Sequence, residues 1–217
     1  MFSDYSPGSC FFLPNGTFIY NKLLQYIREL YREHNFCEVI TPNIFNLNLW
    51  KKSGHYKNYK ENLFLIQNNS NSCQSHSHTD SSYFGLKPMN CPAHCLIFSH
   101  KTHSYKELPI RYADFGALHR NEVTGSLTGL TRVRRFQQDD AHIFCREDQV
   151  REEILGQLKM IDSIYGVFGF KYNLLLSTRP EKYMGDVEMW NKAEEALSNA
   201  LKVFGKDFQV NKGDGAF

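Results

Sequence analysis

The sequence contains no apolar run as long as a membrane-spanning helix requires, so we expect no membrane partner. Its formal net charge is only +2, which gives no global signal for binding a polyanion, so any contact with nucleic acid must be local. The opening stretch MFSDYSPGSC has neither the layout of a secretory signal nor that of an arginine-rich transit peptide. Six irregularly spaced cysteines indicate reduced thiols rather than a disulfide framework. We therefore expect an intracellular, cytoplasmic protein.

Three segments carry the apolar periodicity of amphipathic helices. Apolar residues recur at helical spacing from Thr17 to Glu33, from Arg146 to Phe168 and from about Met189 to Phe204. The stretches FCEVITPNIF, LFLIQ and FKYNLLLSTRP predict strands, the first interrupted at Pro42 because proline cannot donate to a sheet ladder. No internal repeat or compositional break divides the 217 residues, so residues 1–217 are expected to form one domain.

One segment lacks apolar side chains almost entirely. Residues 68–82, NNSNSCQSHSHTDSS, cannot bury enough surface to offset the entropy of ordering them, so we predict a disordered insertion. Cys73, His76 and His78 have metal-ligating side chains, but a flexible polar loop offers a metal no preformed geometry.

The string KPMNCPAH follows a strand predicted from Tyr83 to Lys87. Pro92 suits the first turn of a helix, and we expect that helix to carry Leu96, Ile97 and Phe98 into the core.

Cysteine and histidine cluster at the start of that helix. Cys91 would lie at the helix N-terminus, where the helix dipole favours a thiolate, although a cysteine in such a place is more often a buried core residue. A local zinc site made by Cys91, His94 and Cys95 would need its donors to converge from one helical turn, which is a weak arrangement.

The segment from Arg111 to His142 is the richest in chemistry. Strand-like runs at residues 110–118 and 133–144 flank a loop of glycine, threonine and serine, which predicts a long antiparallel hairpin. Guanidinium groups on neighbouring strands suit a polyphosphate, which needs bidentate, charge-assisted hydrogen bonds. On composition alone, a solvated and charged sheet edge is the simpler interpretation. The arginines of the segment are Arg111, Arg120, Arg132, Arg134 and Arg135.

The order of residues in this segment resembles a known family. HRNE followed by GSLTGLTRVRRFQQDDAH is similar to motif 2 of the class II aminoacyl-tRNA synthetases, in the form found in threonyl-tRNA synthetases, and KPMNCPAH upstream fits the same family. The helix, the VITP strand and LWKKSGH resemble motif 1, which forms much of the homodimer interface in that family. The resemblance implies an α+β fold with a mainly antiparallel sheet flanked by helices. It also implies a homodimer.

The resemblance implies an activity and a nucleotide site. The activity is ATP-dependent activation of threonine to threonyl-adenylate and transfer to tRNA(Thr), with Mg²⁺ bound alongside ATP. Arg120 matches the arginine that binds the α-phosphate and the amino acid carboxylate, and Glu122 the residue near the adenine amino group. Arg132 matches the γ-phosphate arginine, and Phe136 the aromatic on which adenine stacks.

It also implies a threonine site with zinc. Cys91 and His142 match two zinc ligands, and a third histidine lies much later in the family. Met89, Gln138 and Asp140 match threonine-pocket positions, with Asp140 accepting a hydrogen bond from the threonine hydroxyl. Three protein ligands leave zinc open to the substrate.

The chain departs from the family in two ways. Ala93 stands where the family commonly has glycine, and the sequence ends at GDGAF, before motif 3, the third zinc histidine and the anticodon-binding domain. We therefore expect a C-terminally truncated, incomplete core. The alternative is a non-catalytic, dimerising or regulatory module with the same fold. A third reading, a prolyl or seryl class II synthetase, is disfavoured by Cys91 with His142.

Overall fold

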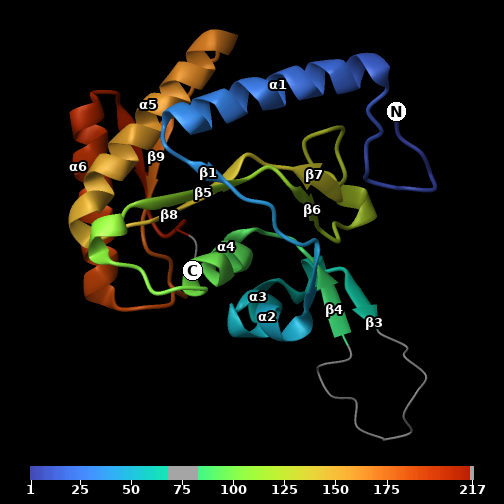
Figure 1. Ribbon diagram of the computed structural model, residues 1–217, viewed down its shortest axis with the longest axis horizontal. Helices are drawn as coiled ribbons and strands as arrows, with labels where there is room; N and C mark the ends of the chain where they lie inside the picture. Colours follow the sequence, from blue (N-terminus) through green and yellow to red (C-terminus); the bar gives the residue numbers. More distant parts are fainter. Residues whose placement is uncertain (68–82, 216–217) are drawn as a thin grey trace, which may run out of the picture. The chain divides into compact units, whose positions relative to one another are not determined.

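A computed structural model of the chain describes residues 1–67 and 83–215 (Figure 1). The predicted disordered insertion at 68–82, with Cys73, His76 and His78, lies outside the described residues. The chain divides into two compact units, and each is described by itself. The first unit comprises Met1–Thr102 and Arg111–His142, and the second comprises His103–Ile110 and Ile143–Phe217.

The long helix α1 (Pro14–Glu33) belongs to the first unit. It begins one turn earlier than predicted because Pro14 already occupies the first turn, where its missing N–H is not needed. It ends at His34, and Asn35 then adopts a left-handed backbone with φ 59°. Tyr31, the buried residue of the helix, donates a 2.9 Å hydrogen bond from its hydroxyl to the backbone oxygen of Asp139.

Short strands, together with the ends of two longer ones, form the sheets of the first unit. One sheet has the order β1-β5-β8, with β1 parallel to β5, and another has the order β2-β4-β3 and is antiparallel. Strands β6 and β7 form a separate antiparallel pair. The bounds are β1 (Cys37–Glu38), β2 (Ile44–Asn46), β3 (Leu65–Gln67), β4 (Tyr83–Leu86), β5 (Ile110–Asp114), β6 (Ala117–His119), β7 (Arg135–Gln137) and β8 (Asp140–Phe144).

An aromatic core holds the β2-β4-β3 sheet against two short helices, α2 (Leu47–Lys52) and α3 (His55–Tyr59). Trp50 is fully buried and packs with Leu47 and Leu63. Because this core lies beside β4, it fixes the point from which the KPMN segment leaves the sheet. Single 3-10 helical turns occur at Lys60–Asn62, Tyr105–Glu107, Thr124–Ser126 and Glu147–Gln149.

Helix α4 (Cys91–Ser99) differs from the prediction in the face it buries. Leu96 is 48% exposed and Ile97 and Phe98 are only half-buried, so the expectation that these three enter the core was wrong. The buried residues are Pro92, Ala93 and His94. The fully buried residues of α4 thus lie in its first turn, and they include the polar side chain of His94 as well as apolar ones.

The second unit is built from two helices and a two-stranded parallel sheet. Leu158, Leu176 and Leu201 form its core. Both helices end at a glycine with a left-handed backbone, Gly169 and Gly205. The elements are α5 (Val150–Phe168), β9 (Leu174–Ser177), α6 (Val187–Phe204) and β10 (Phe208–Asn211).

The α+β class predicted from the resemblance is confirmed. The antiparallel pairing occurs in the β2-β4-β3 sheet and in the β6–β7 hairpin, whereas β1–β5 and β9–β10 are parallel. Across residues 1–67 and 83–215, no helix combines the length and the apolar character needed to cross a bilayer.

Candidate active site

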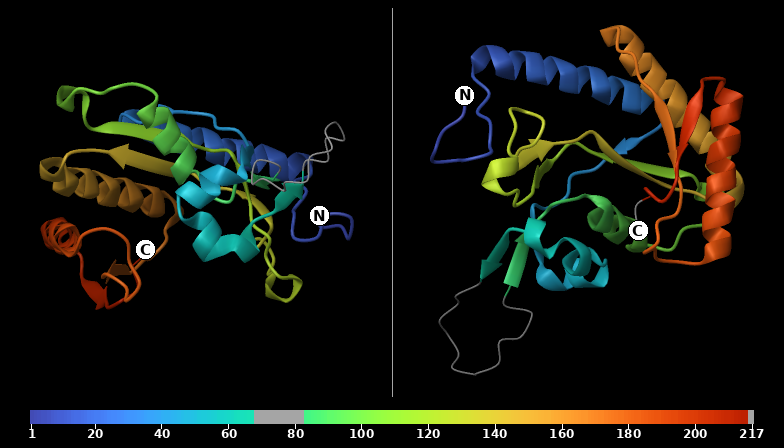
Figure 2. Two further views of the ribbon diagram at one scale, coloured as in Figure 1. Left: turned by 90° about the horizontal axis from the view of Figure 1, so that it is seen from below. Right: turned by 180° about the vertical axis from the view of Figure 1, so that it is seen from behind.

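A cleft of about 530 Å³ is lined by strand β7 and by residues of the loop that joins β6 to β7. Leu118 pairs with Phe136 and His119 with Arg135, so the residues that follow β6 face those that precede β7 (Figures 1 and 2). The predicted hairpin is confirmed, although each predicted strand is split into two shorter ones. The cleft is lined by Arg120, Glu122, Leu130, Thr131, Arg132, Val133, Phe136, Gln137 and Gln138.

Arg120 is held in the cleft from two sides. Its Nε donates to the backbone oxygen of Pro88 at 3.3 Å, and its guanidinium carbon lies 5.0 Å from the centre of the Phe136 ring. These contacts join the KPMN segment to strand β7 through one cation. The side chain is thus oriented before any ligand arrives, which suits recognition of an anion.

Glu122 and Arg132 form an ion pair across the mouth of the same cleft. The Arg132 Nε and a terminal nitrogen lie 3.1 and 3.0 Å from Glu122 Oε2. The Arg132 side chain is 57% exposed, whereas the Glu122 side chain is only 11% exposed, so the exposed arginine is the mobile partner of the pair. A polyphosphate in the cleft would offer Arg132 an alternative anionic partner.

Arg134 has a structural role. Its Nε donates to the Glu122 backbone oxygen at 2.8 Å, and its backbone N–H donates to the oxygen of Gly8 at 2.6 Å. Gly8 has φ 76°, and a Cβ there would lie 2.9 Å from Arg134 Cγ, so only glycine fits. The N-terminal segment is fastened to the hairpin in this way. Arg134 is consequently occupied by the backbone.

A smaller pocket of about 180 Å³ adjoins Arg120 and Glu122 and contains the predicted threonine contact Met89. His55, which the sequence analysis did not single out, also lines it. Its Nε2 lies 3.2 Å from Met89 Sδ and its Nδ1 2.8 Å from Ser53 Oγ. Burial lowers the pKa of His55, and the contact with Ser53 offsets this only in part.

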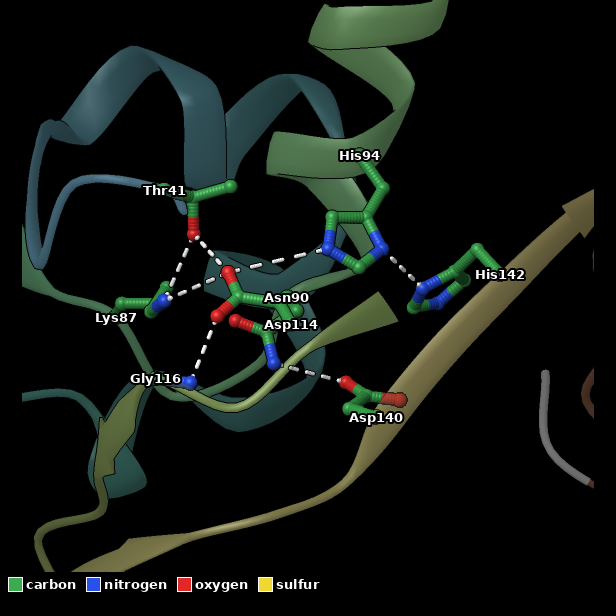
Figure 3. A network of polar contacts seen from close by, with 8 residues as sticks. All are labelled: Thr41, Lys87, Asn90, His94, Asp114, Gly116, Asp140 and His142. Carbon is green, nitrogen blue, oxygen red and sulfur yellow. Dashed lines mark hydrogen bonds and ion pairs between the residues drawn. The ribbon is translucent and has the colours of Figure 1, made fainter. Parts of the chain in front are cut away.

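Two predicted site residues lie on β8, the threonine-pocket residue Asp140 and the zinc ligand His142, and each contacts a fully buried side chain from the start of α4 (Figure 3). The Asn90 amide donates to Asp140 Oδ2 at 3.1 Å. The His94 Nδ1 lies 2.7 Å from the His142 Nδ1. Asn90 and His94 are four residues apart, which places them on one face of a helix, and Asp140 and His142 are two residues apart, which places them on one face of a strand. The two pairs can therefore meet.

A buried ion pair between Lys87 and Asp114 lies next to these contacts, and the sequence analysis assigned it no role. Lys87 and Asp114 are 0% and 1% exposed, and Lys87 Nζ lies 3.5 Å from Asp114 Oδ2. The Thr41 hydroxyl donates to Asp114 at 2.7 Å and accepts from Lys87 at 2.8 Å (Figure 3). The Gly116 N–H donates to Asp114 Oδ1 at 2.7 Å. Every charge in the cluster is therefore matched.

The same contacts set the charge state of Asp114. Burial alone would raise its pKa, but the adjacent His94 ring, the hydrogen bonds from Thr41 and Gly116 and the Lys87 ammonium together hold the pKa of Asp114 well below its ordinary value. The carboxylate is accordingly ionised at neutral pH.

The predicted zinc ligands fit zinc by donor type. Thiolate sulfur and imidazole nitrogen are common zinc donors, and the contact with His94 leaves His142 Nε2 as the nitrogen available to a metal. In the part of the chain that the structure describes, no three His, Cys, Asp or Glu side chains are gathered to hold a metal. Cys91 and His142 thus supply only part of a donor set.

The prediction that the helix dipole favours a Cys91 thiolate was wrong for the metal-free chain. Burial raises the pKa of Cys91, the Asp140 carboxylate raises it further, and Arg120 lowers it only in part. The desolvation of the first turn of α4 outweighs the dipole.

Comparison with known proteins gives consistent findings. The tRNA synthetase class II core domain (G, H, P, S and T) matches residues 72–212. Over its full length the chain is 59% identical to the probable cytoplasmic threonine–tRNA ligase of Encephalitozoon cuniculi and 56% identical to cytoplasmic threonine–tRNA ligase 1 of Rattus norvegicus. It spans 32% and 30% of these relatives, so about a third of their length.

A solved structure agrees with these relatives. The crystal structure of the RNA-binding domain of threonyl-tRNA synthetase from Cryptosporidium parvum Iowa II superposes with a TM-score of 0.89 at 53% identity, covering all of this chain and 52% of that one.

The buried cluster predicts a pH dependence of stability. Because the folded pKa of Asp114 is depressed, its ionised form stabilises the fold above the ordinary aspartate pKa of about 4, and this contribution is lost as the pH falls towards the lower folded pKa. Asp114→Asn should reduce the free energy of unfolding at pH 7 by about 3–5 kcal/mol, since it leaves Lys87 buried without a counter-charge.

Urea unfolding of both proteins between pH 7 and pH 3 measures this. The difference in the free energy of unfolding between wild type and Asp114→Asn should become smaller below about pH 4. The control is Asp207→Asn, at an exposed position, which should change the free energy of unfolding little. A difference that stays constant over the whole range would contradict the assignment.

Proposed function

The chain belongs to the tRNA synthetase class II core domain family, among its threonyl-tRNA synthetase members, and from that membership we propose that it supplies the catalytic core of a threonine–tRNA ligase. The proposed reaction is ATP-dependent activation of threonine, followed by transfer to the terminal adenosine ribose of tRNA(Thr). The observation that most directly supports this proposal is the cleft at the β6–β7 hairpin, which brings Arg120, Arg132 and Phe136 together. The proposed compartment is the cytoplasm, as in the names of the two relatives.

In this proposal the cleft holds ATP. Adenine stacks on Phe136 with its amino group near Glu122, and the exposed side chain of Arg132 turns from Glu122 to bind the γ-phosphate. Magnesium bound with ATP would offset part of the phosphate charge. The cleft volume of about 530 Å³ lies within the range usual for small-molecule sites.

The activation step transfers the adenylyl group. A carboxylate oxygen of threonine attacks the α-phosphorus in line, the bond from that phosphorus to the bridging oxygen of pyrophosphate breaks, and pyrophosphate leaves. Arg120, anchored by Pro88 and Phe136, contacts both the carboxylate and the α-phosphate. Its contribution is positioning and the stabilisation of developing negative charge.

Threonine would be selected at the pocket beside Arg120. Met89 lines that pocket, Gln138 lines the adjoining cleft, and Asp140 is oriented by Asn90 to accept from the substrate hydroxyl. Zinc held by Cys91 and His142 would act as a Lewis acid for the threonine amino and hydroxyl groups. Valine lacks that hydroxyl, whereas serine keeps it and is not excluded by this means.

The test is amino-acid-dependent exchange of pyrophosphate into ATP by this chain. Exchange should proceed with threonine and exceed that with valine by roughly 10⁴-fold, because a site built for a hydroxyl rejects an analogue without one. A folded chain that shows no exchange with any amino acid would refute turnover by this chain alone. The same assay on a longer chain would then distinguish an incomplete core, which gains exchange, from a non-catalytic, synthetase-like module, which does not.

The same assay tests the nucleotide site with a matched pair of variants. Phe136→Leu should raise the KM for ATP about tenfold, because base–aromatic stacking contributes ~1–3 kcal/mol. Phe170→Leu, at a largely exposed position of the second unit, should leave it unchanged.

A further prediction concerns the metal. The chain should bind Zn²⁺ or the spectroscopic probe Co²⁺ at a single site, and Cys91→Ser should abolish the thiolate-to-cobalt absorption band because the sulfur donor is gone. Cys95→Ser, on the exposed side of the same helix, should retain the band. Equal spectra for the two variants would remove Cys91 from the ligand set.

We also propose a homodimer through α1. Three apolar side chains near the start of this helix are largely exposed, Phe18 at 66%, Ile19 at 59% and Leu23 at 43%, and a second copy of the chain would cover them. Ile19→Glu should weaken dimerisation by at least about tenfold, since the interface would bury a charge. Sedimentation equilibrium measures this, with Asn199→Glu as the control on α6. A wild-type chain that remains monomeric would contradict the proposal.

A further inference from the structure

His94 is the fully buried residue through which the Lys87–Asp114 cluster reaches strand β8 (Figure 3). Its Nδ1 lies 2.7 Å from the His142 Nδ1, and its Nε2 lies 3.9 Å from Asp114 Oδ2. That Nε2 is buried and makes no hydrogen bond among the described residues. The ring is thus enclosed between a second imidazole and a carboxylate, and it faces both with nitrogen atoms.

Two imidazole nitrogens 2.7 Å apart require one donor and one acceptor. Asp114 determines which of the two rings donates and which accepts. Its carboxylate is ionised and can only accept, so it favours an N–H on the His94 nitrogen that faces it, Nε2. A His94 ring that carries its proton on Nε2 alone has a lone pair at Nδ1. His94 is then the acceptor, and the His142 Nδ1–H is the donor.

This ordering has a consequence for His142. With its proton on Nδ1, the Nε2 of His142 carries the free lone pair. A metal-binding histidine usually has this arrangement, with one nitrogen on the metal and the other donating to a hydrogen-bond acceptor that fixes the ring. The acceptor is commonly a carboxylate or a backbone carbonyl. Here the acceptor is the imidazole of His94, and the Asp114 carboxylate lies beside the other nitrogen of that ring.

We propose that His94 is a positioning residue that, backed by Asp114, fixes His142 in the Nδ1–H tautomer and so presents the Nε2 of His142 as the metal donor. This inference rests on the zinc site of the proposed function and deepens it. His94 is not itself a ligand in this scheme, because both of its nitrogens are directed at protein groups. It therefore replaces the sequence-based alternative in which His94 joins Cys91 and Cys95 at a local site.

The first experiment reads the tautomers directly in the metal-free wild-type chain. Nitrogen-15 NMR of ring-labelled histidine distinguishes a protonated from an unprotonated ring nitrogen. The expected pattern is a proton on Nδ1 of His142 and on Nε2 of His94. The reverse pattern, with His94 donating from Nδ1, would overturn the proposal. No substitution is needed for this readout, so it stands even where variants fail to fold.

The second experiment measures zinc affinity by competition with a chelator. His94→Phe fills the space but cannot accept, and it should weaken zinc binding by about 10–100-fold, the usual effect of losing such a partner. His94→Asn has a carbonyl oxygen near the position of Nδ1 and should restore most of the affinity. His100→Phe, at an exposed position just beyond the same helix, is the matched control and should bind zinc as wild type does.

The outcomes separate the two proposals. A wild-type chain that binds no zinc overturns the proposed zinc site. A wild-type chain that binds zinc, together with a His94→Phe variant that binds it equally tightly, overturns the role of His94 and leaves the zinc site standing.

Discussion

The buried pairing of Lys87 with Asp114 is the constraint on which the candidate site depends. It joins the end of β4, the end of β5 and the segment that carries Thr41, and both charged side chains are buried, at 0% and 1% exposure. Gly116 allows the approach, because a Cβ there would lie 2.8 Å from Asp114 Oδ1 and 3.2 Å from Lys87 Nζ. Buried ion pairs add little net stability but are costly to break, so they favour one arrangement over its competitors.

Two parts of the site follow from that arrangement. Since Lys87 is fixed, the residues after it leave the sheet at a defined point, where the Pro88 carbonyl orients Arg120 and Asn90 orients Asp140. Asp114 is adjacent to His94, which contacts His142. The cleft at the β6–β7 hairpin and the contacts of Asp140 and His142 on β8 are therefore linked to the same buried cluster.

The α+β fold class and most elements could be predicted from local pattern and resemblance. Helical periodicity indicated α1, α5 and α6, and the glycine-rich loop between strand-like runs indicated the β6–β7 hairpin. The prediction was wrong at α4, where Leu96 is exposed and His94 is buried. From hydrophobicity alone, leucine is expected to be buried in preference to histidine. Histidine is buried here instead because a partner such as Asp114 lies beside it, and the sequence does not show where that partner lies.

The sequence by itself determined the family and most of the elements, and it singled out Arg120, Arg132 and Phe136, which line the cleft, because motif order and apolar periodicity are properties of neighbouring positions along the chain. The tertiary structure alone decided how the charges are matched. Thr41, Lys87 and Asp114 are separated by dozens of positions yet share one hydrogen-bonded cluster. It also decided that the Cys91 pKa rises and that His94 meets His142. Burial and distance between remote residues set these properties, and neither is encoded in a local pattern.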